Sequence, residues 1–261
     1  MSTEAADTAS PFGTRLRHWR RHRGLSQLGL AAQVGSTGRH ISFLETGRSR
    51  PSRQLVLRLA DTLGMGLREA NELLHAAGLP AAYPRAGTDL APYRAAVDRL
   101  LRAHEPYPGM VLDGHWNVLS ANRPCALLFG ETVVGSNFVR DALANPAAAE
   151  AIVNWPEVAW AGLDRLRREL NRAPFDDGLR GLVGLAESAL AGVPRPATTG
   201  SDPLVCPWFR IGDRVVRTIT MVARFDHATE VTLDELRVEL MYPMDDDAER
   251  FFRTGHPLPG V

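Results

Sequence analysis

The order of glycine, serine and apolar residues between positions 24 and 52 constrains this chain more than any other feature of its sequence. The segment contains GLSQ at 24–27, LAAQVGS at 30–36 and ISFLETGRSRPS at 41–52. Ser26 is suited to begin a helix, because its hydroxyl can accept a hydrogen bond from a free backbone N–H of the first turn. Gly35 is suited to the turn that follows, since a left-handed backbone costs glycine nothing. The pattern predicts two short helices, at 27–33 and 37–46.

Apolar periodicity predicts three further helices around this pair. They are expected at residues 12–23, from Pro51-Ser52 onward, and at 67–77. Ser36 is expected to cap the second short helix. Two short helices that share a tight turn form a helix-turn-helix, whose second helix fits the major groove of DNA. We therefore expect an all-α, five-helix DNA-binding domain at residues 11–79, after a disordered tail at 1–10.

The distribution of charge supports a nucleic-acid partner for the first part of the chain. Residues 11–60 hold ten arginines and one acid, a net charge of +9, whereas residues 61–261 hold twenty arginines and twenty-seven acids, a net charge of −7. A basic module on an acidic body is the electrostatic pattern of a small DNA-binding domain with a larger partner domain. Charge alone leaves a solvated charged face as the alternative.

Residues up to 79 resemble the Cro/phage-repressor type of helix-turn-helix, often called the XRE family. The resemblance rests on Gln27 after the N-cap, Gly35 in the turn, the inner apolar positions and GRSRPS at 47–52. It implies that double-stranded DNA is the partner and that Gln27 holds a phosphate at a helix N-terminus. It also implies that Arg39 reads guanine through O6 and N7. The residues expected to bind DNA are Gln27, Thr37, Gly38, Arg39, His40, Ser42, Phe43, Arg48, Ser49 and Arg50.

Some of these positions have a second interpretation. Gly38 stands where phage repressors place glutamine, so a direct adenine contact is lost there. Phe43 is either a contact for a thymine methyl group or a core aromatic residue, and residues 48–50 either bind phosphates or form a solvated loop. Because one such domain reads only a few base pairs, we expect a homodimer on an inverted-repeat operator.

The rest of the chain predicts a second, mixed α/β domain at 93–261. Pro80, Pro84, Gly87 and Pro92 indicate a linker at 80–92. Helices are expected at 93–104, 123–129, 155–171, 178–191 and 246–253. Strands are expected at 110–113, 116–121, 204–211, 214–225 and 231–242.

A wider set of motifs resembles the MmyB-like regulators. It includes HEPYPGMVLDGHWNVLSANRPCALLFG at 104–130, IVNWPEVA at 152–159 and VTLDELRVELMYPMD at 231–245. The resemblance implies a multidomain protein with a PAS-like second domain, a five-stranded antiparallel sheet flanked by helices. It also implies a small apolar ligand, for which a fatty acid is the family's example.

We expect such a ligand between the sheet and the helix at 155–171. Most apolar residues here also suit an ordinary core, but pockets combine apolar walls with a few polar groups. Asn122, Arg123 and Arg217 could meet a polar head group. The residues expected to bind the ligand are Trp116, Asn122, Arg123, Trp155, Trp160, Leu163, Leu166, Phe209, Arg217 and Met221.

The sequence contains no motif of a known catalytic or cofactor site, so we expect no enzyme activity, no catalytic residue and no cofactor. Cys125 and Cys206 lack metal-ligand spacing, and we expect no metal. No apolar run is long enough to cross a membrane, and no signal peptide precedes the first helix, which favours the cytoplasm. The leading hypothesis is a ligand-responsive DNA-binding transcription regulator. The alternative is a DNA-binding protein whose second domain is a protein-interaction or dimerisation module without a ligand.

Overall fold

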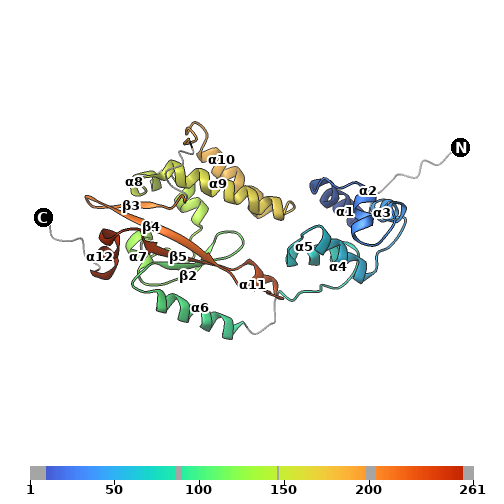
Figure 1. Cartoon of the computed structure of the whole chain (residues 1–261), viewed down its shortest axis with the longest axis horizontal. Coiled ribbons are helices and arrows are strands. Elements are labelled where there is room, and N and C mark those ends of the chain that lie inside the picture. The colour runs from blue at the N-terminus through green and yellow to red at the C-terminus, as the bar shows by residue number, and fades with distance from the viewer. Residues whose placement is uncertain (1–9, 86–89, 146, 198–203, 255–261) are drawn as a thin grey trace. The chain divides into compact units, whose positions relative to one another are not determined.

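The structure, a computed structural model, describes residues 10–85, 90–145, 147–197 and 204–254. The expected tail lies outside the described residues except for Ser10, and so do residues 86–89 of the expected linker. The chain divides into two compact units (Figure 1). The first comprises residues 1–87 and 228–234, and the second comprises residues 88–227 and 235–261.

The first unit is helical, as predicted. Its main helices are α1 (Pro11–His22), α2 (Gln27–Gln33), α3 (Gly38–Glu45), α4 (Arg53–Thr62) and α5 (Leu67–Ala76). They enclose a core that includes Trp19, Leu30 and Ile41, each at most 1% exposed. The turn between α2 and α3 contains Gly35 with a φ of 64°, the left-handed conformation that the sequence predicts there.

Hydroxyl N-caps begin four of these helices. The caps Ser10, Ser26, Thr37 and Ser52 each accept a hydrogen bond from a backbone N–H three residues further on. Thr37, rather than the expected Ser36, caps α3, because its extended backbone directs the hydroxyl to His40 N, 3.1 Å away. Ser36 instead closes the preceding turn by donating its backbone N–H to Ala31 O at 2.8 Å.

Residues 80–85, expected to belong to a linker, are bound to the first unit. The guanidinium of Arg53 donates to two carbonyl oxygens of this segment, at 2.5 and 3.1 Å. The side chain of Asn71 accepts from two of its backbone N–H groups, at 2.9 and 3.0 Å. The prolines of this segment therefore prevent a helix, and polar side chains of α4 and α5 hold it in place.

Residues 228–234 join the first unit from far along the chain. The backbone N–H of Val231 donates to Pro84 O at 3.0 Å, and the hydroxyl of Thr232 donates to Arg85 O at 3.3 Å. Val231 is 1% exposed. The chain thus passes from the second unit into the first and back again, a return that local sequence patterns did not predict.

The second unit is built on a five-stranded antiparallel sheet in the order β2-β1-β5-β4-β3. The strands are β1 (Gly109–Leu112), β2 (Val118–Ala121), β3 (Trp208–Ile211), β4 (Arg214–Ala223) and β5 (Arg237–Pro243). The helices are α6 (Ala91–His104), α7 (Cys125–Phe129), the π-helix η1 (Val139–Leu143), α8 (Ala148–Ala151), α9 (Trp155–Arg172), α10 (Asp177–Ala189) and α12 (Asp246–Thr254). This architecture confirms the predicted multidomain fold with an α/β second domain.

The two faces of the sheet carry different layers, because successive strand residues point to opposite sides. On the outer face, α6 packs on β1 and β5 through a small cluster that includes Leu101 and Leu240. On the inner face, a larger cluster joins the sheet to α7, η1, α9, α10 and α12. Figure 1 shows α6 on one side of the sheet and α9 and α10 on the other.

Two predicted strands were wrong in part. The strand predicted at 204–211 is confined to β3, and the strand predicted at 231–242 begins as a helical turn, α11 (Val231–Glu235), before β5. The carboxylate of Glu230 accepts a hydrogen bond from Leu233 N at 2.9 Å and stabilises this turn. The apolar alternation at its start suits either conformation, and this local side-chain bond favours the helix.

Candidate DNA interface and ligand cavity

The helix α3, the second of the helix-turn-helix, presents most of the expected DNA contacts to solvent. Thr37, Arg39, Arg48 and Arg50 are exposed, and Gly38, His40, Ser42, Phe43 and Ser49 are half-buried. The guanidinium carbon of Arg39 lies 5.2 Å from the centre of the Phe43 ring, one helical turn away. Phe43 is not among the buried core residues of the unit. The structure therefore places Arg39 and Phe43 side by side on the accessible face of α3.

A buried carboxylate, Glu45, ties the first three helices together. Glu45 is 0% exposed and accepts hydrogen bonds from Arg20 Nε and Nη2 of α1, at 2.5 and 3.0 Å, and from Gln27 Nε2 of α2, at 2.8 Å. Burial by itself raises the pKa of this carboxyl. The hydrogen bonds from Arg20 and Gln27 and the charges of Arg20 and Arg17 outweigh burial, and the net effect lowers the pKa.

Gln27 thus has an internal partner that the sequence analysis did not foresee. Its side-chain nitrogen is bound to Glu45, so the expected phosphate contact is left with the second N–H of the same amide and the free backbone N–H groups at the start of α2. Gln27 therefore links the position of the buried carboxylate to the surface that is expected to bind DNA.

The basic charge at the surface is smaller than the formal charge of residues 11–60. Arg20 is buried against Glu45, and Arg15 pairs with Glu72 at 2.8 Å. Arg23 and Arg53 donate to backbone carbonyl oxygens inside the unit. Arg17 also pairs with Glu45, at 3.5 Å, so five of the ten arginines make contacts inside the fold. The exposed arginines of this segment are Arg21, Arg39, Arg48, Arg50, Arg53 and Arg58, of which Arg53 is bound to residues 80 and 81.

Leu28 is a candidate DNA contact that the sequence analysis missed. It lies in α2 and is 71% exposed, the most exposed large apolar side chain described in the first unit. A Cβ added at Gly38, the first residue of α3, would lie 3.6 Å from Leu28 Cα, so the two helices meet at this point. Its position off the buried stripe of Leu30, Ala31 and Val34 was the available signal.

In the second unit, a cavity of about 250 Å3 lies between α9 and the inner face of the sheet. We call it the α9 cavity. α9 lines it with Val158, Ala161, Gly162, Arg165 and Arg168, which recur on one side of the helix. The remaining lining residues are Met110, Leu112, Trp116, Phe138, Leu143, Val205, Pro207, Thr220, Glu239 and Met241. An apolar cavity of about 150 Å3 holds benzene, so this space is large enough for a small apolar ligand.

The cavity opens over a different side of α9 from the one expected. Leu163 and Leu166, expected to face a ligand, are 1% and 0% exposed and belong to the packed core. The large side chains of α9 are packed in the core, whereas the smaller side chains on its other side leave space between the helix and the sheet. At Gly162 the missing side chain lets Leu143 pack closely against α9, since a Cβ there would lie 2.5 Å from Leu143 Cδ1.

A buried ion network borders the α9 cavity. Arg165 donates to Glu239 at 2.7 Å and lies 3.3 Å from Glu169, which is also paired with Arg237. Burial raises the pKa of Glu169, but the charge and hydrogen bond of Arg237, a bond from Trp116 and the charge of Arg165 outweigh it and lower the pKa. The network joins α9 to β5, and Arg224, which follows β4, lies 3.9 Å from Glu169 as a third cation.

Trp116 lines the cavity and also contacts this ion network. Its indole N–H donates to Glu169 at 2.7 Å, and the guanidinium carbons of Arg165 and Arg237 lie 4.6 and 4.9 Å from its ring centre. Its φ of 65° is a left-handed value that a bulky residue rarely adopts. Such strain persists only where the surroundings hold it.

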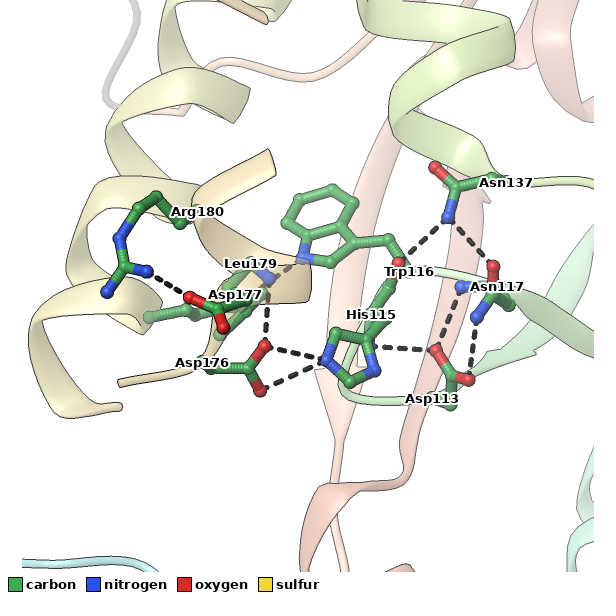
Figure 2. Close-up of polar contacts among 10 residues, drawn as sticks. Asp113, His115, Trp116, Asn117, Asn137, Asp176, Asp177, Leu179 and Arg180 are labelled. Atoms are coloured by element: carbon green, nitrogen blue, oxygen red, sulfur yellow. Dashed lines mark hydrogen bonds and ion pairs between the residues drawn. The ribbon is translucent and has the colours of Figure 1, made fainter. Parts of the chain in front are cut away.

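Figure 2 shows the polar side chains that hold this turn. Asp113 accepts from the backbone N–H groups of His115 and Asn117, at 2.8 and 2.9 Å. Asn137 donates to His115 O at 2.8 Å. The ring of His115 lies 2.9 Å from Asp176, the residue that caps α10. The turn between β1 and β2 is thereby fixed from two sides.

A second cavity, of about 430 Å3, lies next to α8 and β3. We call it the α8 cavity. Phe209, expected to bind the ligand, lines it together with Phe129, Phe138 and Ala142. Trp116 and Phe209 are therefore the two expected ligand residues that line these cavities, one in each.

The structure places the other expected ligand residues elsewhere. Asn122 is buried and donates to Leu101 O and Tyr107 O, while its carbonyl oxygen accepts from Gly109 N. Arg123 is exposed at the start of α7. Trp155 packs in the core with its indole N–H bound to Ala142 O, and the Trp160 ring lies under Arg195.

Arg217 and Met221 lie on the outer face of β4, away from both cavities. Arg217 stacks on the Trp208 ring at 4.8 Å, and Met221 is 52% exposed. The cavity residue Thr220 directly precedes Met221 in β4, so the strand alternation directs Met221 outward. Sequence periodicity marked these residues as apolar or charged but could not assign a sheet face.

The lining residues that the sequence did not predict include small or charged ones of α9 and β5, beside apolar ones such as Met110 and Leu143. Ala161, Gly162, Arg165 and Glu239 have no apolar signal of their own. The helical spacing of the three α9 residues is present in the sequence, but the leucines on another side of the helix form the stronger apolar pattern. Within the described residues, no cluster of three His, Cys, Asp or Glu side chains is arranged to hold a metal ion, and no helix is long and apolar enough to cross a membrane.

Comparison with known proteins agrees with this geometry. Residues 93–254 match the family described as the MmyB-like transcription regulator ligand binding domain, and residues 11–73 match a helix-turn-helix domain family. Both are domains of transcription regulators rather than enzyme families. Among curated proteins, no sequence matches the chain. The chain is therefore a member of the MmyB-like transcription regulators, a helix-turn-helix DNA-binding protein with a C-terminal domain of the ligand-binding type.

Proposed function

We propose that the second unit binds a ligand with an apolar chain and an anionic head, such as a fatty acid, in the α9 cavity. The observation that carries this proposal is the composition of the wall. Apolar side chains make up most of it, and its charged members are Arg165, Arg168 and Glu239. Pockets of this kind bind the ligand body by apolar contact and fix its orientation with a few polar groups.

The two arginines suit the head group in different ways. Arg168 is exposed and lies at the rim, where it can attract a carboxylate before entry. Arg165 is already paired with Glu239, so a ligand carboxylate that binds Arg165 competes with β5 for this cation. Ligand binding would then weaken the ion pair between Arg165 of α9 and Glu239 of β5.

This competition supplies a route to the DNA-binding unit. Only Glu235 and Leu236 separate β5 from residues 228–234, which are part of the first unit. A ligand changes DNA affinity only by its differential affinity for two conformations of the protein. We take the hydrogen bonds of Val231 and Thr232 to residues 84 and 85 as the contacts that transmit the change. The regulator acts as a homodimer on an inverted repeat, since one domain reads too few base pairs alone.

Ligand binding by the full-length protein tests the proposal. Dodecanoic acid should raise the melting temperature, whereas dodecanol, which lacks the anion, should raise it less. Ala161→Phe fills the α9 cavity and should abolish the shift. Ala149→Phe, on the exposed side of α8, is the matched control and should keep it. Loss of binding in both variants, or in neither, would place the ligand outside this cavity.

A second candidate function rests on the outer face of the sheet. Val215 and Met221 are 39% and 52% exposed there, next to the part of the sheet that α6 covers. Such a face suits a protein-interaction or dimerisation module without a ligand. If no amphipathic acid binds and Met221→Glu dissociates a dimer in solution, this second function is favoured.

A further inference from the structure

The α9 cavity and the α8 cavity share one wall residue. Phe138 lines both of them. It directly precedes the π-helix η1, whose Leu143 faces the α9 cavity and whose Ala142 faces the α8 cavity. Phe138 and η1 therefore contribute to the walls of both spaces, of about 250 and 430 Å3.

The ring of Phe138 stands in the middle of an aromatic row that runs from one cavity to the other. Its centre lies 6.2 Å from the Trp116 ring, in the α9 cavity, and 5.8 Å from the Phe129 ring, in the α8 cavity. Phe129 in turn lies 5.4 Å from Phe209.

The backbone of Phe138 is fixed while its side chain has space on two sides. Its N–H donates to Trp116 O at 2.9 Å, which anchors the residue to the strained turn described above. The side chain is half-buried, unlike Val139 and Leu143 of the adjoining helix. A ring that faces cavities loses few contacts when it changes rotamer, because empty space supplies no partner atoms.

We infer that Phe138 sets the length of the apolar chain that the second unit accepts. This inference rests on the proposed function. With the ring in place, a ligand chain ends at the Phe138 wall of the α9 cavity. With the ring removed or turned away, the two cavities join, and the joined space falls within the roughly 300–1,000 Å3 typical of small-molecule pockets.

The size of the expected effect follows from the burial of methylene groups. Each additional buried methylene strengthens binding about fourfold. For the wild-type protein, affinity should rise along the series of saturated acids from hexanoic acid and level off once the α9 cavity is full. For Phe138→Ala, the rise should continue to longer acids, such as hexadecanoic acid, before it levels off.

The experiment measures dissociation constants of the full chain for this series by calorimetry. Phe138→Ala is compared with Phe225→Ala, a half-buried phenylalanine of the outer-face cluster, which should keep the wild-type profile. Phe138→Leu retains an apolar side chain and serves if the alanine variant does not fold; it should shift the profile in the same direction.

The outcomes distinguish a failure of the inference about Phe138 from a failure of the proposed function. A profile that moves to longer acids in both Phe138 variants, and not in Phe225→Ala, supports the inference. Binding with an unchanged profile in the Phe138 variants overturns the inference and leaves the proposed ligand class intact. If the wild-type protein binds no acid of the series, the proposed function fails, and the inference fails with it.

Discussion

Two glycines of the first unit differ sharply in what a single methyl group would meet. A Cβ at Gly38 would lie 3.6 Å from the nearest atom of Leu28, an ordinary contact. A Cβ at Gly13 would lie 2.4 Å from Glu45 O, a backbone atom that cannot move freely. Gly38→Ala should therefore stabilise the unit by about 0.4–1 kcal/mol, because it restricts the unfolded chain.

Gly13→Ala is the matched comparison and should destabilise the unit by about 1–3 kcal/mol through overpacking. Urea denaturation of the full chain, followed by the helical signal, measures both changes. Equal effects of the two substitutions would contradict the close approach of α1 to the end of α3.

Arg39 and Arg48 are both exposed, but they belong to different parts of the expected interface. Arg39, beside Phe43 on α3, should read a base, and Arg48, after the helix, should bind a phosphate. Arg39→Ala should cost roughly 1–3 kcal/mol at one base pair and relax the base preference there. Arg48→Ala should weaken binding to all sequences alike.

Fluorescence anisotropy with a selected operator and single-base variants of it distinguishes these two effects. If Arg39→Ala weakens binding to every variant by the same factor, Arg39 is a phosphate contact and not a base reader.

At the scale of elements, Glu45 controls how α1, α2 and α3 stay together. Its folded pKa lies below the ordinary value of 4.5, so the unfolded chain binds more protons in acid. The free energy of unfolding is therefore greatest above that value and falls as the pH drops through the folded pKa. Glu45→Gln should remove this pH dependence and cost about 3–5 kcal/mol at neutral pH, because Arg20 stays buried without its counter-charge.

The control is Glu72→Gln, which breaks the partly exposed pair with Arg15 and should cost about 0–1 kcal/mol. Denaturation of the full chain at neutral pH and at about pH 4 measures both variants. A Glu45→Gln variant as stable as Glu72→Gln would contradict the role given to the buried carboxylate.

Local elements were predictable where a short-range interaction decides them. The N-cap Ser26, the turn at Gly35 and the bounds of α2 follow from chemistry within a few residues. The helical turn α11 was mistaken for strand, because an apolar alternation suits both and the deciding bond comes from Glu230. The α9 cavity was expected beside the correct helix but on its leucine side, since sequence shows which side chains are large and not which space stays empty.

At the scale of the whole molecule, the connection between the units was the feature least visible in the sequence. The prolines predict a linker at 80–92, whereas residues 80–85 are bound to the first unit, and the return of residues 228–234 depends on contacts between segments far apart in the chain. Similarly, the formal charge of +9 could be counted from the sequence, while the use of Arg20 and Arg53 inside the fold could not.

Residues 228–234, which return to the first unit, allow a test of the proposed regulation. Val231→Ala removes buried apolar contacts in the first unit and should loosen the segment. DNA affinity without a ligand should stay within about twofold of wild type, because the DNA-facing residues are unchanged, whereas the ligand effect should shrink toward none. Val215→Ala, on the exposed outer face, should retain the full effect. A Val231→Ala variant with the wild-type ligand response would rule out this route.

The central claim is that a ligand in the second unit changes the affinity of the first unit for DNA. The most direct measurement is the dissociation constant of the full-length protein for its selected operator, by fluorescence anisotropy, with and without saturating dodecanoic acid. Coupling of about 1–3 kcal/mol predicts a change of roughly 5–150-fold. An unchanged dissociation constant, under conditions where calorimetry shows the acid bound, would contradict the claim.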